Sequence, residues 1–361
     1  MFGHPLAQSQ DNGEQPGPMA ADLSAGEAKA FEAGPRVSVV ISVHNRAAML
    51  LDCFRGLAGQ TMPRGSVEVV VVDNCSTEDL GPTLEQGRAL GLDLRAARTA
   101  EDRGPAPARN MGVAMARGTV IAFTDSDCRP TPNWLAAALP CFDDPAVAFV
   151  GGPVLPKPEQ KVNFTSRATF ITPEEHPTFP TANLLVRRDI FLAHGGFDAS
   201  LSFTDPFARA TECADTDLAW RIIEAGHARE FAAEAVMEHE VETQPLWLWM
   251  IDPSRLFVLP ALISRHPGLR PKLLTWNLFF YPPAATLYLA VPFALVTAST
   301  VPWLLWLLPL ALLGRSAVRT RSLNPLVLLR QSLRVLAHFP RMVVMNGALI
   351  YGSVRFRCLV L

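Results

Sequence analysis

Thr119-Val120-Ile121-Ala122-Phe123-Thr124 runs without a break into Asp125-Ser126-Asp127. The first six residues are apolar or β-branched, and the run has the length of a strand that is buried on both faces. Two carboxylates therefore leave the end of a buried strand close together. Like charges this close are unfavourable unless a cation lies between them, and hard oxygen ligands suit Mg²⁺ or Mn²⁺. Such a cation can in turn hold a diphosphate.

Further strands precede this one in the chain. Residues 36–43 and 67–72 are β-branched runs of strand length, and residues 92–96 form a weaker one. Helical segments separate them, over residues 47–57 and around residues 108–116. This alternation predicts an α/β fold in which helices flank a mostly parallel sheet.

Polar side chains follow three of the predicted strands, at Asn45, Asp73 and Asp125. Ligands of open α/β sheets gather beyond the carboxyl ends of the strands. We therefore expect these three side chains to converge on one crevice. Their position at strand ends also distinguishes Asp125 and Asp127 from a chance pair of aspartates in a solvated turn.

The order of these segments resembles that of the family 2 glycosyltransferases of the GT-A fold, over about residues 36–242. The matching stretches in the first half are Val37-Ser38-Val39-Val40-Ile41-Ser42-Val43-His44-Asn45-Arg46, Val70-Val71-Val72-Asp73-Asn74-Cys75-Ser76-Thr77 and Ala108-Arg109-Asn110-x-Gly112. Those in the second half are Ala182-Asn183-Leu184-Leu185-Val186-Arg187-Arg188, Gly195-Gly196-Phe197-Asp198 and Asp215-Thr216-Asp217-Leu218-Ala219-Trp220-Arg221.

The resemblance implies a division of roles among four aspartates. Asp73 should bind the nucleobase, Asp125 should lie near the ribose and the metal, and Asp127 should ligate the metal. Asp215 should be the general base that takes the proton of the acceptor hydroxyl, while the cation neutralises charge on the departing diphosphate. Such a displacement inverts the anomeric configuration.

The chain departs from the family pattern next to the expected base. Family members commonly have Glu-Asp here, whereas this chain has Ala214 before Asp215. Asp217 or Glu212 therefore remains an alternative base. An acid at the start of a helix also interacts favourably with the helix dipole, which offers a purely structural explanation for Asp215.

Several other residues receive expected roles from the same resemblance. Asn45 and Arg109 are expected at the nucleotide-sugar, and His239 is a further candidate for the metal or diphosphate. Asn183 and Asp217 are expected on the acceptor side. The Gln-x-x-Arg-Trp motif of processive members does not occur, which favours transfer of one sugar per encounter.

The last third of the chain has a different composition from the rest. Residues 253–361 contain eleven Arg, one Lys and no acidic residue, although the whole chain has a net charge of -2. Residues 278–314 carry no charge at all. This uncharged stretch is long enough for one membrane-spanning helix and nearly long enough for two short ones. This hydrophobicity favours a membrane over nucleic acid as the partner of the basic region.

These patterns predict five parts. They are a flexible leader (1–35), a GT-A catalytic domain (36–245), a juxtamembrane segment (246–277), a transmembrane or re-entrant hairpin (278–314) and a basic amphipathic helical tail (315–361). Basic residues on both sides of the hairpin indicate that both ends are cytoplasmic. The alternative for the last two parts is a soluble helical subdomain.

The predicted function is that of an inverting, metal-dependent glycosyltransferase bound to the membrane, with its catalytic domain in the cytoplasm. It would move one sugar from a nucleotide-diphosphate sugar, with a UDP-sugar expected, to a lipid-linked or glycan acceptor. Two alternatives remain open: a sugar-phosphate nucleotidyltransferase, and an inactive membrane-anchored protein that binds nucleotide-sugars. A dehydrogenase is excluded because no Gly-x-Gly-x-x-Gly follows the first strand.

Overall fold

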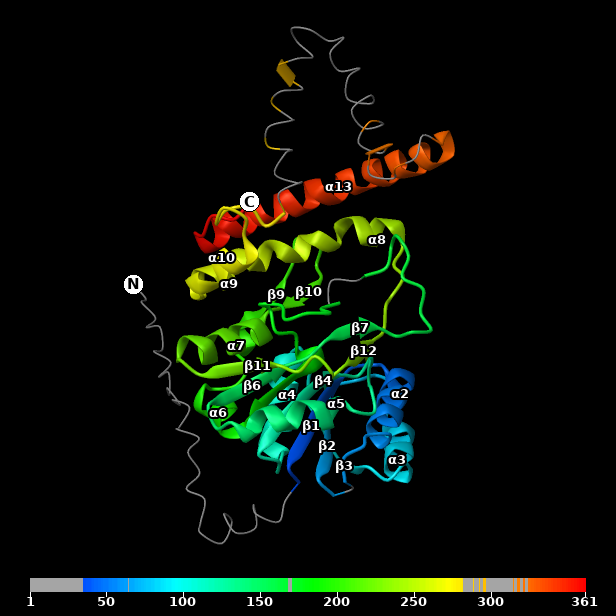
Figure 1. Ribbon diagram of the computed structural model, residues 1–361, viewed down its shortest axis with the longest axis vertical. Coiled ribbons are helices and arrows are strands. Elements are labelled where there is room, and N and C mark those ends of the chain that lie inside the picture. The colour runs from blue at the N-terminus through cyan, green and yellow to red at the C-terminus, as the bar shows by residue number, and fades with distance from the viewer. Residues whose placement is uncertain are drawn as a thin grey trace, which may run out of the picture. The chain divides into compact units, whose positions relative to one another are not determined.

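A seven-stranded sheet forms the centre of the structure, a computed structural model that describes residues 35–63, 65–167, 171–281 and 324–361 and a few single residues between 282 and 323 (Figure 1). The strand order is β11-β6-β8-β4-β1-β2-β3, and β8 alone runs antiparallel to its neighbours within this sheet. Its strands are β1 (Val37–Val43), β2 (Val67–Asp73), β3 (Asp93–Arg98), β4 (Val120–Asp125), β6 (Val147–Gly151), β8 (Leu184–Arg187) and β11 (Ala228–Phe231).

Short strands and helices complete the described chain. The strands β5 (Cys128–Pro130), β12 (Met237–His239) and β7 (Val154–Pro156) form a second sheet, and β9 (Ser202–Thr204) pairs with β10 (Ala210–Glu212). The α-helices are α2 (Ala47–Ala58), α3 (Gly81–Ala89), α4 (Pro105–Met115), α5 (Trp134–Ala138), α6 (Arg188–Ala193), α7 (Ala214–Glu224), α8 (Leu246–Ile251), α9 (Leu259–Arg265), α10 (Arg270–Leu273) and α13 (Pro325–Phe356). Short 3-10 helices are η1 (Leu139–Asp143), η2 (Thr181–Asn183), η3 (Ala199–Leu201), η4 (Asp252–Val258) and η5 (Pro267–Leu269).

Alternate residues of the parallel strands face two different hydrophobic cores. Val40 and Ile121 point into the core that α4 and α7 cover, whereas Val39 and Ile41 point into the core on the side of α2. Gly112 lets α4 approach the sheet, because a Cβ at this position would lie 2.5 Å from Val40 Cγ1. Burial on both faces explains why these strands read as continuous apolar runs.

The predicted α/β fold with a mostly parallel sheet is confirmed. The four predicted strands correspond to β1, β2, β3 and β4, and the two predicted helices correspond to α2 and α4. The antiparallel strand β8, inserted between β4 and β6, was not predicted. Its four residues are too few to show a period of their own.

The helices after residue 245 share a core with the sheet domain. Helix α13 lies along η4 and α9 (Figure 1), and Leu349 is fully buried in the same cluster as Phe257 and Ile121. A Cβ on Gly352 would lie 2.1 Å from the carbonyl oxygen of Phe257, so the two backbones touch there. The predicted boundary at residue 245 therefore does not divide two hydrophobic cores.

One described helical stretch, Leu246–Arg265, is long and apolar enough to cross a membrane. Of its most apolar window, 61% is buried within the protein, which is also typical of a core helix. The predicted hairpin at 278–314 lies almost entirely outside the described residues, as does the predicted leader. The division of the chain into five parts stays a prediction.

Asn183 is a buried hub between three segments. Its Oδ1 accepts a hydrogen bond from the Trp134 indole at 2.8 Å, and its Nδ2 donates to the carbonyls of Pro153 at 2.9 Å and Ala235 at 2.7 Å. Gly152 makes room for this amide, since a Cβ there would lie 2.6 Å from Nδ2. The side chain is only 2% exposed. It therefore fixes the segment that leads into β12.

We expect Asn183→Ala to lower the free energy of unfolding by at least about 2 kcal/mol, because each buried polar group left without a partner costs about 1–3 kcal/mol. Asn133→Ala, at an exposed position before α5, should change it by less than about 0.5 kcal/mol. Thermal and urea unfolding of the two variants checks this. If Asn183→Ala leaves the stability unchanged but weakens acceptor binding, Asn183 contacts the acceptor.

Candidate functional site

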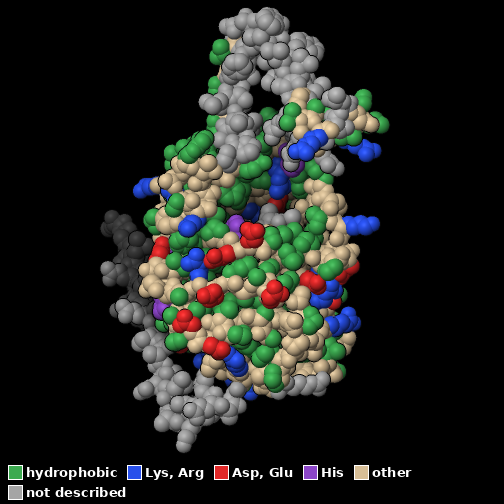
Figure 2. All heavy atoms as spheres, viewed as in Figure 1, with side chains coloured by type: hydrophobic (Ala, Val, Ile, Leu, Met, Phe, Trp, Pro, Cys, Tyr) green, Lys and Arg blue, Asp and Glu red, His purple; other side chains and the backbone are tan. Residues whose placement is uncertain are grey.

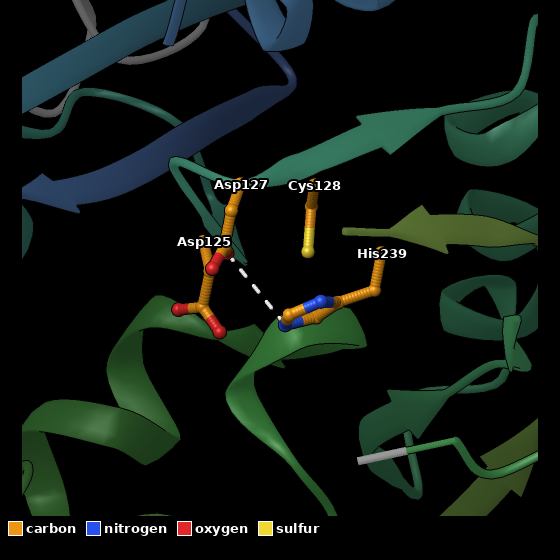
Figure 3. A group of neighbouring side chains, drawn as sticks. All are labelled: Asp125, Asp127, Cys128 and His239. Carbon is orange, nitrogen blue, oxygen red and sulfur yellow. Dashed lines mark ion pairs between the residues drawn. The ribbon is translucent and has the colours of Figure 1, made fainter. Parts of the chain in front are cut away.

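Four side chains meet where β4 ends and β5 and β12 lie side by side (Figure 3). Asp125 ends β4, Asp127 follows it, and His239 pairs with Cys128 across the second sheet. One candidate ligand atom from each of these residues lies within 4.8 Å of all the others. Sheet pairing, and not proximity in sequence, thus brings His239 to the aspartates.

The carboxylate of Asp127 is buried and its two oxygens differ. Oδ2 accepts a hydrogen bond from the Arg46 guanidinium, while Oδ1 is buried and has no hydrogen-bond partner among the described residues. His239 Nε2 lies 3.6 Å from Oδ1. Because His239 Nδ1 donates to the carbonyl of Glu240 at 2.7 Å, the neutral ring keeps its lone pair on Nε2. These residues fit a bound cation.

The donor set favours a hard divalent cation. Burial, followed by the charges of Asp125 and Asp127, raises the pKa of the Cys128 thiol well above its usual value. Without an ion the thiol is therefore protonated, and the other three candidate ligands are two carboxylate oxygens and an imidazole nitrogen. This set suits Mg²⁺ or Mn²⁺.

Arg109 of α4 is buried between two acidic residues. Its guanidinium donates to Asp125 Oδ1 at 2.6 Å and lies 3.8 Å from Glu212 Oε2. Burial alone would raise the pKa of Asp125, but the charge of Arg109 and its hydrogen bond lower that pKa. Burial and the charge of Asp215 raise the pKa of Glu212 to about 7, against the opposing effect of Arg109.

Asp215 lies in the first turn of α7 and lines a cavity of about 1070 Å³ together with Arg109, Asp125 and Glu212. Its Oδ1 accepts from the backbone N–H of Thr216 at 2.8 Å, and its Oδ2 accepts from a more distant N–H, that of Thr181, at 3.4 Å. Burial raises the pKa of Asp215, although these bonds and Arg109 oppose it. A raised pKa makes a carboxylate a stronger base.

Asp73 and Asn45 lie on adjacent loops, after β2 and β1. Asp73 Oδ1 accepts from the N–H of Ser76 at 2.8 Å, and its Oδ2 accepts from Arg98 at 2.7 Å. Asn45 has a left-handed φ of 52°, and its Oδ1 accepts from the N–H of Thr77 at 2.7 Å. Asn45 thus holds the two loops together, and neither residue lines the cavity. Their predicted contacts with the nucleotide stay predictions.

Two predicted site residues do not line the cavity, and their expected roles on the acceptor side stay predictions. Asn183 uses its whole amide in the buried hub described above. Asp217 is fully buried and lies 2.8 Å from Arg221, 2.9 Å from Arg265 and 3.1 Å from His266. Despite burial, hydrogen bonds from His266 and Arg221 lower the pKa of Asp217. It is therefore an anchor between α7 and α9 and is poorly suited to act as a base.

Sequence reasoning missed the role of Arg46. A basic residue directly after the first strand lies at the same sheet edge as Asp127, so its position was the available signal. The part of the cavity wall contributed by η4, α9 and α13 had no comparable signal, because those residues come from segments far along the chain.

We expect the pH dependence of the free energy of unfolding to reflect the titration of the Glu212 carboxyl group. Its pKa is about 7 in the folded protein and near 4.5 in an unfolded chain, so the folded state binds the extra proton. The free energy of unfolding should therefore fall as pH rises from about 4.5 to about 7, by at most about 3 kcal/mol, and level off above. Comparing melting temperatures of the wild type and Glu212→Gln across this range isolates the effect.

The exposed Glu101 provides the control, since Glu101→Gln should reproduce the wild-type pH curve. A Glu212→Gln curve that parallels the wild type would show that this carboxyl titrates normally.

Comparisons with known proteins identify the family of the chain. The family model "Glycosyl transferase family 2" matches residues 38–200. The glycosyltransferase AglE of Haloferax volcanii is 30% identical over 243 residues, which are 63% of this chain and 80% of AglE. A pre-mycofactocin glycosyltransferase of Mycobacterium tuberculosis is 29% identical over 223 residues, which span 58% of this chain but only 43% of that protein.

Among solved structures, a mannosyltransferase from Pyrobaculum calidifontis in complex with GDP-Man and Mn²⁺ has a similar fold. The TM-score is 0.55 at 23% sequence identity, and the match covers 92% of this chain and 93% of that one. The fold, the family model and the archaeal relative together lead to one conclusion. This chain belongs to the family 2 glycosyltransferases.

Proposed function

We propose that this glycosyltransferase is metal-dependent and inverting, and that it moves one sugar from a nucleotide-diphosphate sugar to a hydroxyl of a lipid-linked or glycan acceptor. One observation carries the proposal. A buried carboxylate oxygen of Asp127 faces His239, and Asp125 beside them also lines the cavity that contains the carboxyl of Asp215, whose pKa burial raises. A cation site and a base thus lie at one sheet edge.

Asp125, Asp127 and His239 would hold the cation. When bound there, a divalent cation supplies positive charge that offsets the negative charge developing on the departing diphosphate. Arg46 fixes the orientation of Asp127 through Oδ2 and leaves Oδ1 for the ligand. Arg109 performs the same task for Asp125, and keeps it ionised. Asp73 is proposed to contact the nucleobase, and a UDP-sugar remains the donor we expect.

Asp215 is proposed to take the proton of the acceptor hydroxyl. The acceptor oxygen then forms a bond to the anomeric carbon on the face opposite the bond to the diphosphate, which breaks, and the configuration inverts. Oδ2 of Asp215 has only the longer of the two backbone contacts and is the better placed oxygen. Glu212 is less suitable, because Oε1 accepts from the N–H of Ala106 at 2.9 Å and Oε2 lies near Arg109.

Helix α13 supports a position at the membrane surface. It is 32 residues long, and exposed apolar side chains recur along one side of it at intervals of three, four or seven residues. They are Leu326, Leu329, Leu333, Leu336, Val343, Ile350 and Val354. The acidic side chains in Figure 2 lie over the sheet domain, whereas α9 and α13 show hydrophobic and basic ones. We propose that this stripe lies in the cytoplasmic face of the membrane.

We expect Asp215→Asn to lower kcat by roughly 10²–10⁴-fold, the usual contribution of a general base, while donor binding with Mn²⁺ is retained. Asp127→Asn should instead abolish the Mn²⁺-dependent part of thermal stabilisation by the donor. The measurement uses purified protein with a panel of UDP-, GDP- and dTDP-sugars, with Mn²⁺ or EDTA.

Glu212→Gln and the exposed Asp143→Asn are the matched comparisons. If Asp215→Asn keeps full turnover and Glu212→Gln loses turnover, Glu212 and not Asp215 is the general base. Equal stabilisation by donors in Mn²⁺ and EDTA would contradict metal dependence.

The membrane proposal predicts different surroundings for Leu336 of α13 and Leu90 beside α3, both exposed in the structure. Leu336→Cys, labelled with an environment-sensitive fluorophore in a variant whose native cysteines are replaced, should be quenched by brominated lipids in anionic vesicles. Labelled Leu90→Cys should instead be quenched by aqueous iodide. Efficient iodide quenching at both positions would contradict the proposal.

A further inference from the structure

Four arginines gather in and behind the cavity wall, away from the aspartates of the cation site. Arg167, Arg255 and Arg341 line the cavity, and Arg209 lies next to them. They come from four separate segments: the chain after β7, the turn between β9 and β10, η4 and α13. Among the described residues, two carboxylates lie within ion-pair distance of them, those of Asp205 and Asp252.

Asp205 and Arg209 form a close ion pair, although Arg209 Nη1 is buried without a hydrogen-bond partner among the described residues and lies 3.6 Å from Asp252 Oδ1. Both oxygen contacts are short, with Arg209 Nε and Nη2 lying 2.9 Å and 2.8 Å from Asp205 Oδ2, and the Ser254 hydroxyl donates to the same oxygen at 2.5 Å. Both guanidinium nitrogens thus donate to one carboxylate oxygen, and charge-assisted hydrogen bonds of this length are strong. The pair neutralises itself and leaves the remaining three arginines to Asp252.

Asp252 does not satisfy those three arginines. Its oxygens lie 3.9 Å from Arg167 Nε, 4.0 Å from Arg255 Nε and 3.7 Å from Arg341 Nη2, all beyond hydrogen-bond distance. Arg167 Nε, Arg255 Nε and Asp252 Oδ1 are buried and have no hydrogen-bond partner among the described residues. Three guanidinium charges thus share one carboxylate.

Burial and neighbouring positive charge act together on two of these arginines. Burial, and after it the charge of Arg167, lowers the pKa of Arg255. Burial also lowers the pKa of Arg341, and Arg209 adds to this effect. Two positive charges remain uncompensated in a partly desolvated wall, where an unpaired charge is costly. A doubly charged anion in the cavity would remove that cost.

Apolar side chains border the same arginines. Leu256 follows Arg255 and Met342 follows Arg341, and both line the cavity together with Leu259, Leu262 and Met345 of α9 and α13. A guanidinium fork matches the oxygens of a phosphate, and an apolar wall matches a hydrocarbon chain. The cavity therefore presents the two chemistries of a lipid phosphate side by side.

We propose that Arg167, Arg255 and Arg341 form the binding site for the phosphate of a lipid acceptor that carries a phosphate monoester as well as the hydroxyl that receives the sugar, and that its hydrocarbon chain contacts α9 and α13. The inference rests on the proposed function, because it assigns this cavity to the acceptor. A phosphate monoester carries about -1.5 to -2 charges at neutral pH, which matches the two uncompensated arginines.

The test measures binding of decyl phosphate, decanol and inorganic phosphate to the full chain in detergent, without donor. We expect decyl phosphate to bind at least about tenfold more tightly than either other probe. Arg255→Gln and Arg341→Gln should each weaken its binding about tenfold, or about 1.4 kcal/mol. Arg330→Gln, which removes the same charge from an exposed position of α13, should leave it unchanged.

Two further variants separate binding from folding. Arg255→Lys keeps the charge and should restore part of the affinity that Arg255→Gln loses. Asp252→Asn removes the competing carboxylate and should tighten binding of decyl phosphate, an effect opposite to that of damage to the fold. Unchanged or weaker binding by a folded Asp252→Asn protein would overturn the proposal.

The probes also distinguish the sources of the ligand. Equal affinity for decanol would overturn the phosphate site, and equal affinity for inorganic phosphate would overturn the lipid assignment. Competition by UDP would assign the arginines to the donor and overturn the proposal. Binding of decyl phosphate without binding of any nucleotide-sugar would support the site and contradict the proposed function. Binding of a nucleotide-sugar without binding of decyl phosphate would contradict the site alone.

Discussion

The guanidinium of Arg109 brings one positive charge into a region that contains the carboxyl groups of Asp125, Glu212 and Asp215. It lies 2.6 Å from Asp125 and 3.8 Å from Glu212, so the nearer group is kept ionised while the farther one is protonated below about pH 7. Asp215 receives less of this charge, and burial leaves its pKa raised. The guanidinium of Arg109 thus gives neighbouring carboxyl groups different pKa values. Different pKa values are what separate roles in a reaction require.

The fold and the sheet-edge half of the site could be predicted from sequence, because both depend on local patterns. Parallel strands buried on both faces must be apolar along their length, so the polar residue that ends each strand marks the edge where ligands bind. Asp125 and Asp127 were recognised in this way. His239 was reached only through the family resemblance, since the pairing of β12 with β5 joins residues more than a hundred positions apart.

Two of the predicted site residues lie away from the cavity for a common physical reason. Asn183 and Asp217 are polar residues in motif-like positions, yet both are buried and every polar atom of their side chains has a partner. A sequence shows which groups can form hydrogen bonds but not whether the fold already satisfies them. The arginines around Asp252 illustrate the reverse case. They come from four segments and show no motif, and only their shared location reveals an excess of charge.

The close backbone contact between Gly352 and Phe257 ties α13 to η4, the element that carries Asp252 and Arg255. If the outer stripe of α13 lies in the lipid surface, this contact fixes the distance between the bilayer and the carboxyl groups of Asp125 and Asp215, with no hinge in between. The site of such an enzyme would lie at one fixed distance from the membrane surface. It would glycosylate hydroxyls that stand at one distance from the lipid surface and pass over chemically identical ones that stand nearer or farther.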